Sequence, residues 1–169
     1  MKQVIILMGS DSDLEQLKPA VQTLKDFGIT YDVRVLSAHR TPKTLEKYLS
    51  GLNKQGTKVI IAAAGGAAHL AGVCAAHSIL PVIGVPIETS NLGGMDSLLS
   101  TVQMPGGMPV ATVAIGKAGA MNAALLACQI LALSDESLET KMKEYREGFE
   151  TKISTKNEKL QGALKTVGL

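Results

Sequence analysis

Residues 31–42 read YDVRVLSAHRTP, and this stretch decides the fold class that we predict. Its first half, Tyr31 to Leu36, alternates between apolar and polar residues with the period of a β-strand. At its end, the Thr41-Pro42 pair predicts the start of a helix, because threonine caps helices and proline suits a first helical position. His39 and Arg40 therefore stand on a turn from a strand into a helix. In parallel α/β sheets ligands bind at this place, outside the carboxyl ends of the strands.

The pair His39 and Arg40 has two interpretations. Histidine titrates near neutral pH and suits proton transfer, and the planar guanidinium of arginine suits a phosphate or a carboxylate. Polar residues are also ordinary in loops, so an isolated pair of this kind establishes no function by itself. The rest of the sequence is needed to tell whether the pair belongs to a binding site or to a solvated loop.

Strands and helices alternate along the rest of the chain. A β-branched run at 2–8 predicts a strand buried on both faces, and the apolar stripe from Leu14 to Phe27, stopped by Gly28, predicts a helix after it. Further strands are predicted at 58–63, 82–85 and 110–115, and further helices at 42–55, 67–78, between Asp96 and Pro105, and at 119–133. Such alternation implies a parallel sheet that is covered on both faces through right-handed crossovers.

We therefore predict a three-layer αβα, flavodoxin-like fold. A chain of 169 residues has room for a single domain with a sizeable core, which we place at residues 1–169. About 1–133 would form the core of this domain, and 134–169 would form a helical tail.

Composition excludes several classes of protein. The net charge of +2 gives no indication of a nucleic acid or an anionic membrane as a partner. No N-terminal signal pattern is visible, and the apolar runs fall short of the ~20 residues that span a bilayer. Cys74 and Cys128 lie far apart in alanine-rich sequence, which indicates buried thiols and a reducing, cytoplasmic location.

The segment from Gly119 to Leu133 is apolar nearly all round, with only Asn122 and Gln129 as polar breaks. A helix without a polar face is expected to be buried on every side, and a domain of this size seldom buries one with its own chain. We therefore predict that this helix is buried between subunits. A central core helix of the monomer is the alternative.

The tail after Leu133 has the opposite pattern. The Ser134-Asp135 pair predicts the cap of a long helix rich in Lys and Glu, whose charges form a solvated face. The apolar stripe of this helix consists of Leu138, Met142, Tyr145 and Phe149. We expect this stripe to pack on a neighbouring subunit.

The turn after the first predicted strand reads GSDSD at 9–13. Its backbone N–H groups and the hydroxyls of Ser10 and Ser12 suit a phosphate at a helix N-terminus. One glycine is too few for a Rossmann or Walker loop, and an aspartate aimed at a phosphate would repel it. Asp13 is better placed to accept hydrogen bonds from ribose hydroxyls. A plain helix cap by Ser10, Asp11 or Ser12 explains the same residues.

The turn after the third predicted strand reads AAAGGAAHLAG at 62–72. Small residues such as the Gly65-Gly66 pair let a planar ligand approach the backbone and leave a pocket with few hydrogen-bonding groups. Tight packing of helix on sheet, with His69 as a capping or core histidine, is the alternative. On a regular helix His69 and Cys74 would lie about 140° apart. Together with His77 their side chains would diverge, so we predict no metal site.

Seven motifs occur in a fixed order along the chain. They are GSDSD (9–13), SAHRTP (37–42), AGGAAHL (64–70), GVP (84–86), DSLLS (96–100), VQMPGG (102–107) and AIGKAGAMNAALL (114–126). Together they resemble the class I 5-(carboxyamino)imidazole ribonucleotide mutases of purine biosynthesis, in the aminoimidazole ribonucleotide carboxylase family. The resemblance covers about the first 133 residues, and only the charged tail is unspecific.

The resemblance implies a role for each motif residue in binding or converting a ribonucleotide. Its phosphate and ribose would meet Ser10, Ser12 and Asp13, while His39 would transfer protons and Arg40 would bind the phosphate. The further substrate-binding residues are Ser37, Ala38, Gly65, Gly66 and His69. The resemblance also implies a homo-octamer of flavodoxin-like subunits, in agreement with the apolar helix, and a reaction that uses no metal and no cofactor.

The mechanism that we expect moves a carboxylate within the substrate. The carbamate loses carbon dioxide, and the electron-rich ring carbon of aminoimidazole ribonucleotide then attacks the same molecule. His39 acts first as an acid on the leaving nitrogen and later as a base on the tetrahedral ring carbon. The small apolar walls from Ala63 to Ala71 suit a captive, uncharged carbon dioxide.

The chain departs from the family pattern at two positions. The family usually has tryptophan at the position of Leu14 and proline at the position of Ala71, and we expect both positions to border the site. The direct carboxylase branch, which uses free carbon dioxide, typically has lysine in place of Arg40 and a polar turn in place of the GGAAH segment at 65–69. The chain follows the mutase pattern at both of these places.

Two other classes of flavodoxin-like protein fit the sequence less well. A flavodoxin-type electron carrier needs a Ser/Thr-Gly-rich phosphate loop and aromatic side chains around the flavin. The chain has no Trp, and no aromatic residue falls in a predicted strand-to-helix turn. A receiver-type signalling module needs a phosphoacceptor aspartate after the third strand, where this chain has alanine and glycine.

Overall fold

The computed structural model describes residues 2–52 and 55–167, and the chain divides into two compact units, residues 1–130 and 131–169. The first unit contains a five-stranded sheet of order β2-β1-β3-β4-β5, in which neighbouring strands run parallel. Its strands are β1 (Val4–Met8), β2 (Tyr31–Val35), β3 (Val59–Ala64), β4 (Val82–Pro86) and β5 (Ala111–Thr112). The predicted parallel α/β sheet is confirmed.

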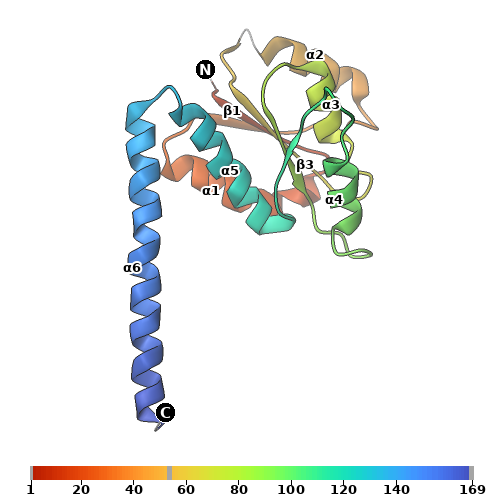
Figure 1. Ribbon diagram of the computed structural model, residues 1–169. Helices are drawn as coiled ribbons and strands as arrows, with labels where there is room; N and C mark the ends of the chain where they lie inside the picture. The colour runs from red at the N-terminus through yellow and green to blue at the C-terminus, as the bar shows by residue number, and fades with distance from the viewer. Residues whose placement is uncertain (1, 53–54, 168–169) are drawn as a thin grey trace. The chain divides into compact units, whose positions relative to one another are not determined.

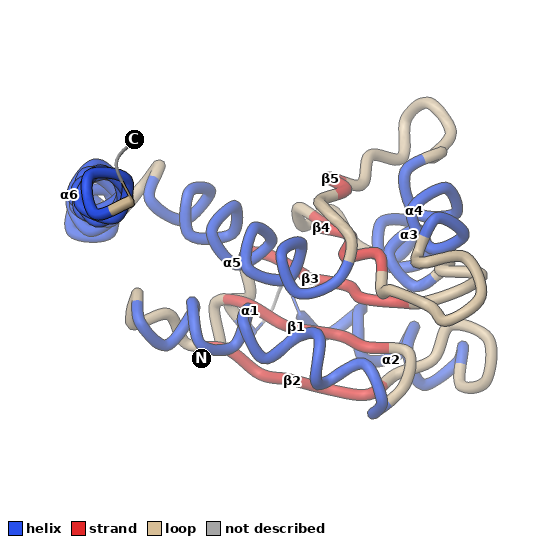
Figure 2. The backbone as a smooth tube through the Cα atoms, turned by 90° about the horizontal axis from the view of Figure 1, so that it is seen from below, coloured by secondary structure: helices blue, strands red, loops and turns tan. Residues whose placement is uncertain are grey.

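Helices cover both faces of the sheet, which confirms the three predicted layers (Figure 1). After a short 3-10 turn at Asp11–Asp13, they are α1 (Leu14–Asp26), α2 (Pro42–Leu52), α3 (Leu70–His77), α4 (Met95–Val102) and α5 (Gly116–Ala132). Figure 2 shows α1 and α5 on one face of the sheet, and α2, α3 and α4 on the other. Strands β1 and β4 are buried along their whole length, because helices cover them from both sides.

Several elements differ from their predicted bounds. Helix α5 begins at Gly116, three residues before the predicted start, and residues 53 and 54 of the helix predicted at 42–55 lie outside the described residues. Helix α3 begins at Leu70, later than the predicted start at 67, because the preceding turn bonds to α4 instead of entering the helix. The strand predicted at 110–115 is reduced to Ala111–Thr112, which pairs with β4 at the edge of the sheet. The Val113 N–H still donates to the Gly84 carbonyl at 3.1 Å, and the chain then leaves the sheet and enters α5 at Gly116.

Helix α5 has one buried face and one exposed face. The buried face consists of Ala120, Ala123, Ala124, Ala127 and Cys128, which are all 0% exposed. On the other face Met121 is 42% exposed, and both Asn122 and Gln129 are exposed. Helix α5 is therefore not a central core helix of the single chain, and that alternative is wrong.

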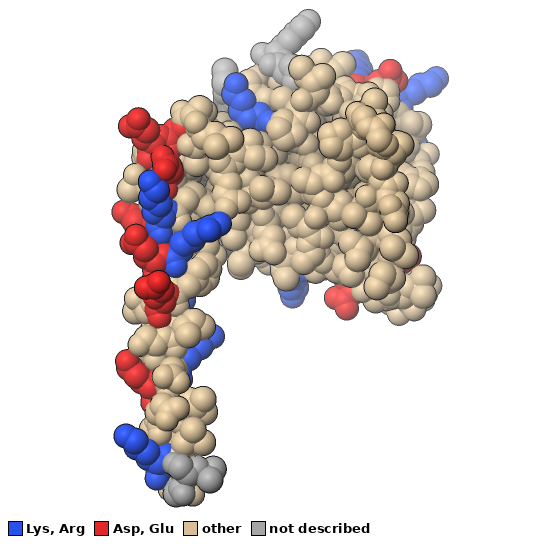
Figure 3. Space-filling model, in the orientation of Figure 1, with Lys and Arg blue, Asp and Glu red and all other residues tan. Residues whose placement is uncertain are grey.

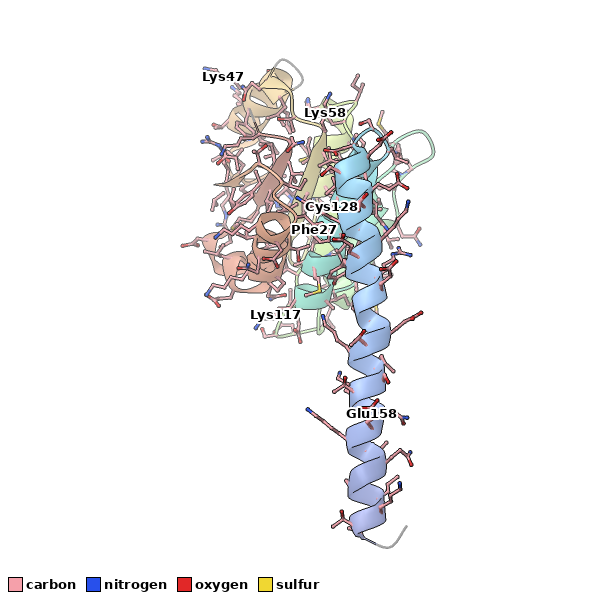
Figure 4. The ribbon with its side chains drawn as sticks, turned by 90° about the vertical axis from the view of Figure 1, so that its left-hand side faces the viewer. Phe27, Lys47, Lys58, Lys117, Cys128 and Glu158 are labelled. Carbon is pink, nitrogen blue, oxygen red and sulfur yellow. The ribbon has the colours of Figure 1, made fainter. Side chains whose placement is uncertain are left out.

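The second unit contains the long helix α6 (Glu136–Thr166). As predicted, Asp135 caps it, and its carboxylate accepts a hydrogen bond from the Leu138 N–H at 3.0 Å. Acidic and basic side chains are interspersed along α6 (Figure 3). Its side chains at 151–160 are all exposed and project on all sides of the helix (Figure 4). Within the described ranges, no helix combines the length and the apolar character needed to cross a membrane.

Candidate active site

The register of the sheet aligns the ends of β2, β1 and β3, so the three turns that follow these strands lie side by side. Met8, at the end of β1, pairs with Val35 of β2 on one side and with Ala63 of β3 on the other. The turns that follow these strands carry the GSDSD, SAHR and GGAAH segments, so all three leave the sheet at the same edge. Strand β1 is also the point at which the strand order reverses, where open α/β sheets form their ligand crevice.

These turns enclose a cavity of about 180 Å³. It is lined by Gly9, Ser10, Asp13, Ser37, Ala38, His39, Arg40, Ala64, Gly65, Ala67, His69 and Leu70. Eight of the ten site residues predicted from the sequence are in this lining. The other two, Ser12 and Gly66, lie in the same turns beside lining residues.

Two histidines meet at this cavity. Nε2 of His39 lies 2.8 Å from Nδ1 of His69, and the two rings meet edge to face at 77° with their centroids 4.8 Å apart. At this distance one of the two nitrogens carries a hydrogen and donates a hydrogen bond to the other. His69 occupies the N-cap position of α3, but its side chain makes no capping hydrogen bond. The residue is exposed, so the alternative of a core histidine is wrong.

The first turn is held by a reciprocal capping box. The Ser10 N–H donates to Oδ2 of Asp13 at 3.2 Å, and the Ser10 hydroxyl accepts from the Ser12 N–H at 3.4 Å. The two serine hydroxyls lie 2.8 Å apart. The helix-cap interpretation of Ser10 is therefore correct, and the same cap lines the cavity.

The carboxyl group of Asp13 lies at the cavity and is mostly buried, with the residue 8% exposed. Burial is the largest influence on this group and raises its pKa above the ordinary value, against the hydrogen bonds from Ser10 and Ser12, which lower it. A carboxylate in this position is a strong acceptor for hydroxyl groups, as the expectation of a ribose contact requires.

Ser37 and Thr41 close the second turn. The Thr41 hydroxyl accepts the Ser37 N–H and donates to the Ser37 carbonyl, both at 3.1 Å. The Ser37 hydroxyl in turn accepts the Arg40 N–H at 3.1 Å. Helix α2 begins at Pro42 as predicted, and the Thr41 hydroxyl bonds within the turn. The turn is thus fixed by the hydroxyls of Ser37 and Thr41, while the side chains of His39 and Arg40 stay exposed beside the cavity.

The chain matches the family model described as AIR carboxylase over residues 3–152. The chain belongs to the AIR carboxylase family.

Relatives in this family match most of the chain. It is 56% identical over 143 residues to the N5-carboxyaminoimidazole ribonucleotide mutase of Brucella melitensis, and the match covers 85% of this chain and 88% of the relative. The protein of the same name from Bacillus subtilis is 53% identical over 155 residues, with 92% and 96% covered. The crystal structure of Treponema denticola PurE superposes with a TM-score of 0.82 at 33% identity, over 93% of this chain and 97% of that one.

Two serines of α4 contact the third turn and were missing from the predicted site. The Ser97 hydroxyl accepts the Gly66 N–H at 2.9 Å, and the Ser100 hydroxyl accepts the Ala68 N–H at 3.0 Å. Both belong to the DSLLS motif that carries part of the family resemblance. Their spacing of three residues places both serines on one helix face, and this spacing was the only indication in the sequence. The spacing does not reveal which turn the face contacts.

The two departures from the family pattern lie outside the cavity lining. Leu14 lines a separate hollow of about 460 Å³ together with Lys18 and Lys117. Ala71 is 2% exposed and belongs to the hydrophobic core on the α2 and α3 side of the sheet. Each of them directly follows a lining residue, Asp13 or Leu70, so both adjoin the site without lining its cavity.

A larger hollow of about 1030 Å³ lies away from the predicted site residues. Its lining includes His77, at the end of α3, together with Pro81 and Met108. The hollow lies at the amino ends of the strands, because its lining includes Val82, the first residue of β4, and Pro81 directly before it. Ligands of parallel α/β sheets bind at the opposite edge, so the small cavity with the two histidines remains the candidate site.

No metal-binding group of three or more His, Cys, Asp or Glu side chains occurs among residues 2–52 and 55–167. Burial raises the pKa of the Cys74 thiol to about 12 and that of Cys128 to about 11. Both thiols therefore stay protonated at neutral pH, as expected of buried structural cysteines.

Proposed function

We propose that this chain is an isomerase that converts 5-(carboxyamino)imidazole ribonucleotide to 4-carboxy-5-aminoimidazole ribonucleotide in purine biosynthesis. Relatives at 50–56% identity carry the name of this mutase. The observation that carries the proposal is the cavity itself, where the His39–His69 pair lies with Arg40 and Ser10. A histidine that can carry a proton lies there beside the Arg40 guanidinium and the Ser10 hydroxyl, which suit a phosphate.

His39 is the proton carrier in this proposal. As an imidazolium it protonates the carbamate nitrogen while the N–C bond breaks and carbon dioxide leaves. The ring carbon of aminoimidazole ribonucleotide then attacks this carbon dioxide, and neutral His39 removes the proton from the tetrahedral carbon. One proton is given and one is taken back, so the cycle balances without a cofactor. The contact with His69 supports this role, since it orients the His39 ring.

The cavity wall supports the capture of carbon dioxide. The lining includes Ala38, Ala64, Gly65 and Ala67, which offer no charged side chain. His39 and Arg40 are exposed at this cavity in the single chain, so retention of carbon dioxide requires that the bound substrate or a second subunit closes it. Once water is excluded, the uncharged molecule is held until the ring carbon attacks it. The reaction then needs neither ATP nor bicarbonate.

The fate of a label tests the proposed function. We expect label in the carbamate carbon to appear in the product even when unlabelled bicarbonate is abundant, because the same carbon dioxide is recaptured. Mass spectrometry of the product, with purified enzyme and no ATP, measures the retained fraction. Extensive washout of the label would favour direct carboxylation by free carbon dioxide, and no conversion at all would reject the isomerase.

Arg40→Ala tests the phosphate contact. Loss of a charged hydrogen-bond partner weakens the binding of the phosphate by ~1.5–3 kcal/mol. The KM for the ribonucleotide should therefore rise about 10- to 100-fold. Arg34→Ala is the matched control, because Arg34 is exposed on β2 and pairs with Asp32 at 2.7 Å, outside the cavity lining. The riboside without phosphate should bind the two variants and the wild type equally. Unchanged affinity of Arg40→Ala for the ribonucleotide would contradict the assignment.

We propose a homo-oligomer, with eight subunits as the family resemblance implies. Exposed apolar side chains support it: Leu99 of α4 is 52% exposed and Met121 of α5 is 42% exposed. The cavity of about 180 Å³ is also smaller than the ~300–1,000 Å³ of most small-molecule sites, as expected if a second subunit completes it. The predicted α6 stripe is free only in part, because Leu138 and Met142 are already buried in the single chain. The same proposal includes packing of its exposed end, at Phe149, on a neighbour and a cytoplasmic location. Light scattering measures the native mass, and a stable native monomer would reject the oligomer.

A further inference from the structure

The turn that carries His69 has an irregular backbone. Residues 65–69 lie between β3 and α3 and form neither strand nor helix. Backbone polar groups in such a turn need partners from elsewhere in the fold. Because Nδ1 of His69 lies 2.8 Å from Nε2 of His39, the position of this turn decides whether the two rings touch.

Ser97 joins this turn to the end of β4. Its hydroxyl accepts the Gly66 N–H at 2.9 Å and donates to the Ile87 carbonyl at 2.7 Å. The residue is 0% exposed, so water does not compete for either bond. Both functions of the hydroxyl, donor and acceptor, are therefore used to hold the turn.

Ser100 binds the same turn two residues further along the chain. Its hydroxyl accepts the Ala68 N–H at 3.0 Å, directly before His69 in the chain. Its single proton has two main acceptors, the Gly66 carbonyl at 3.0 Å and the Asp96 carbonyl of its own helix at 2.7 Å. Whichever of the two it takes, the bond from Ala68 is kept.

Helix α4 is itself anchored away from the histidines. The Thr89 hydroxyl donates to Oδ1 of Asp96 in the first turn of the helix at 2.9 Å. Before this turn, Gly94 has a φ of 87°, and a Cβ there would lie 2.5 Å from Cγ2 of Ile115. Only glycine fits this close approach. The start of α4 is thus fixed by contacts that do not involve the cavity.

We propose that Ser97 and Ser100 are positioning residues for the isomerase reaction. By holding the N–H groups of Gly66 and Ala68, they keep His69 in hydrogen-bond contact with His39. Neither serine lines the cavity, so they act through the turn and not on the substrate. The expected effect of the two serines on turnover rests on the proposed function. Their expected effect on the histidine pair rests on the structure alone.

Ser100→Ala is the main test. Loss of the acceptor for Ala68 should let the turn shift, and kcat should fall about 10- to 100-fold, as small misplacements of catalytic groups do. KM should change less than about threefold, because Arg40 and Ser10 are untouched. Imidazole ¹⁵N resonances of His39 and His69, recorded without substrate, should move toward those of uncoupled rings. Ser100→Thr keeps the hydroxyl and should restore both the kcat and the spectra.

Ser50→Ala is the matched control. Ser50 is an exposed helical serine whose hydroxyl donates to the Lys47 carbonyl at 2.9 Å on α2, so its loss should leave kcat and both resonances unchanged. Ser97→Ala is the second variant, and should act in the same direction as Ser100→Ala if it folds.

Two outcomes would overturn the inference. One is wild-type kcat together with wild-type histidine resonances in Ser100→Ala. The other is a lower kcat with unchanged resonances, which would place the effect elsewhere. If the wild-type protein fails to convert the carbamate, the proposed function is wrong, and the spectra still decide whether the serines hold the histidine pair.

Discussion

His39→Asn is expected to abolish turnover while nucleotide binding persists. Asparagine keeps the approximate size and hydrogen-bonding capacity of the imidazole, but its amide takes up no proton near neutral pH. General acid–base catalysis by one group is typically worth ~10²–10⁴-fold. A residue that acts once as acid and once as base should reach the upper end of this range or exceed it. Steady-state kinetics give kcat, and calorimetry with the nucleotide product gives the Kd.

His77→Asn is the control for this substitution. His77 is the last residue of α3 and lines the larger hollow, not the cavity that contains His39. We expect its turnover to equal that of the wild type. A fully active His39→Asn enzyme would remove His39 from the mechanism. Loss of nucleotide binding together with turnover would show that His39 holds the substrate and would leave its proton transfer unsupported.

Ala127→Glu is expected to unfold the subunit. Ala127 is 0% exposed on the face of α5 that is buried in the single chain, which also carries Ala123 and Ala124. A carboxylate there is buried without a partner, and the protein has to unfold locally or protonate it. The cost should exceed ~4 kcal/mol, a large part of the ~5–15 kcal/mol that stabilises a typical domain. Thermal unfolding followed by circular dichroism measures the loss.

Met121→Glu separates folding from assembly on the same helix. Met121 lies on the exposed face of α5, at 42% exposure in the single chain. We expect this variant to keep its secondary structure and to lose native mass in light scattering, because the charge would be buried only between subunits. A wild-type Tm for Ala127→Glu would contradict the packing of α5. A wild-type native mass for Met121→Glu would contradict assembly through this helix.

The order of the elements and most of the site could be predicted from local patterns. Strand and helix periods are properties of neighbouring residues, so YDVRV and the apolar runs of β1 and β3 were sufficient for a parallel sheet. The turns after such strands must meet at one edge. This rule alone brings Ser10, Ser37 and Gly65 together, and all three line one cavity.

The tertiary structure decided what depends on partners far apart in the chain. His39 and His69 are 30 residues apart, and their contact follows from the register of β2, β1 and β3. The start of α3 could not be predicted for a similar reason: Ala67, Ala68 and His69 are compatible with a helix, but the turn is held in another conformation by Ser97 and Ser100, which lie about 30 residues further along the chain. In α5 nearly every residue is apolar, so its sequence carries no periodic signal of a buried face. Only the packing of Ala127 against its own unit, with Met121 left exposed, shows which face that is.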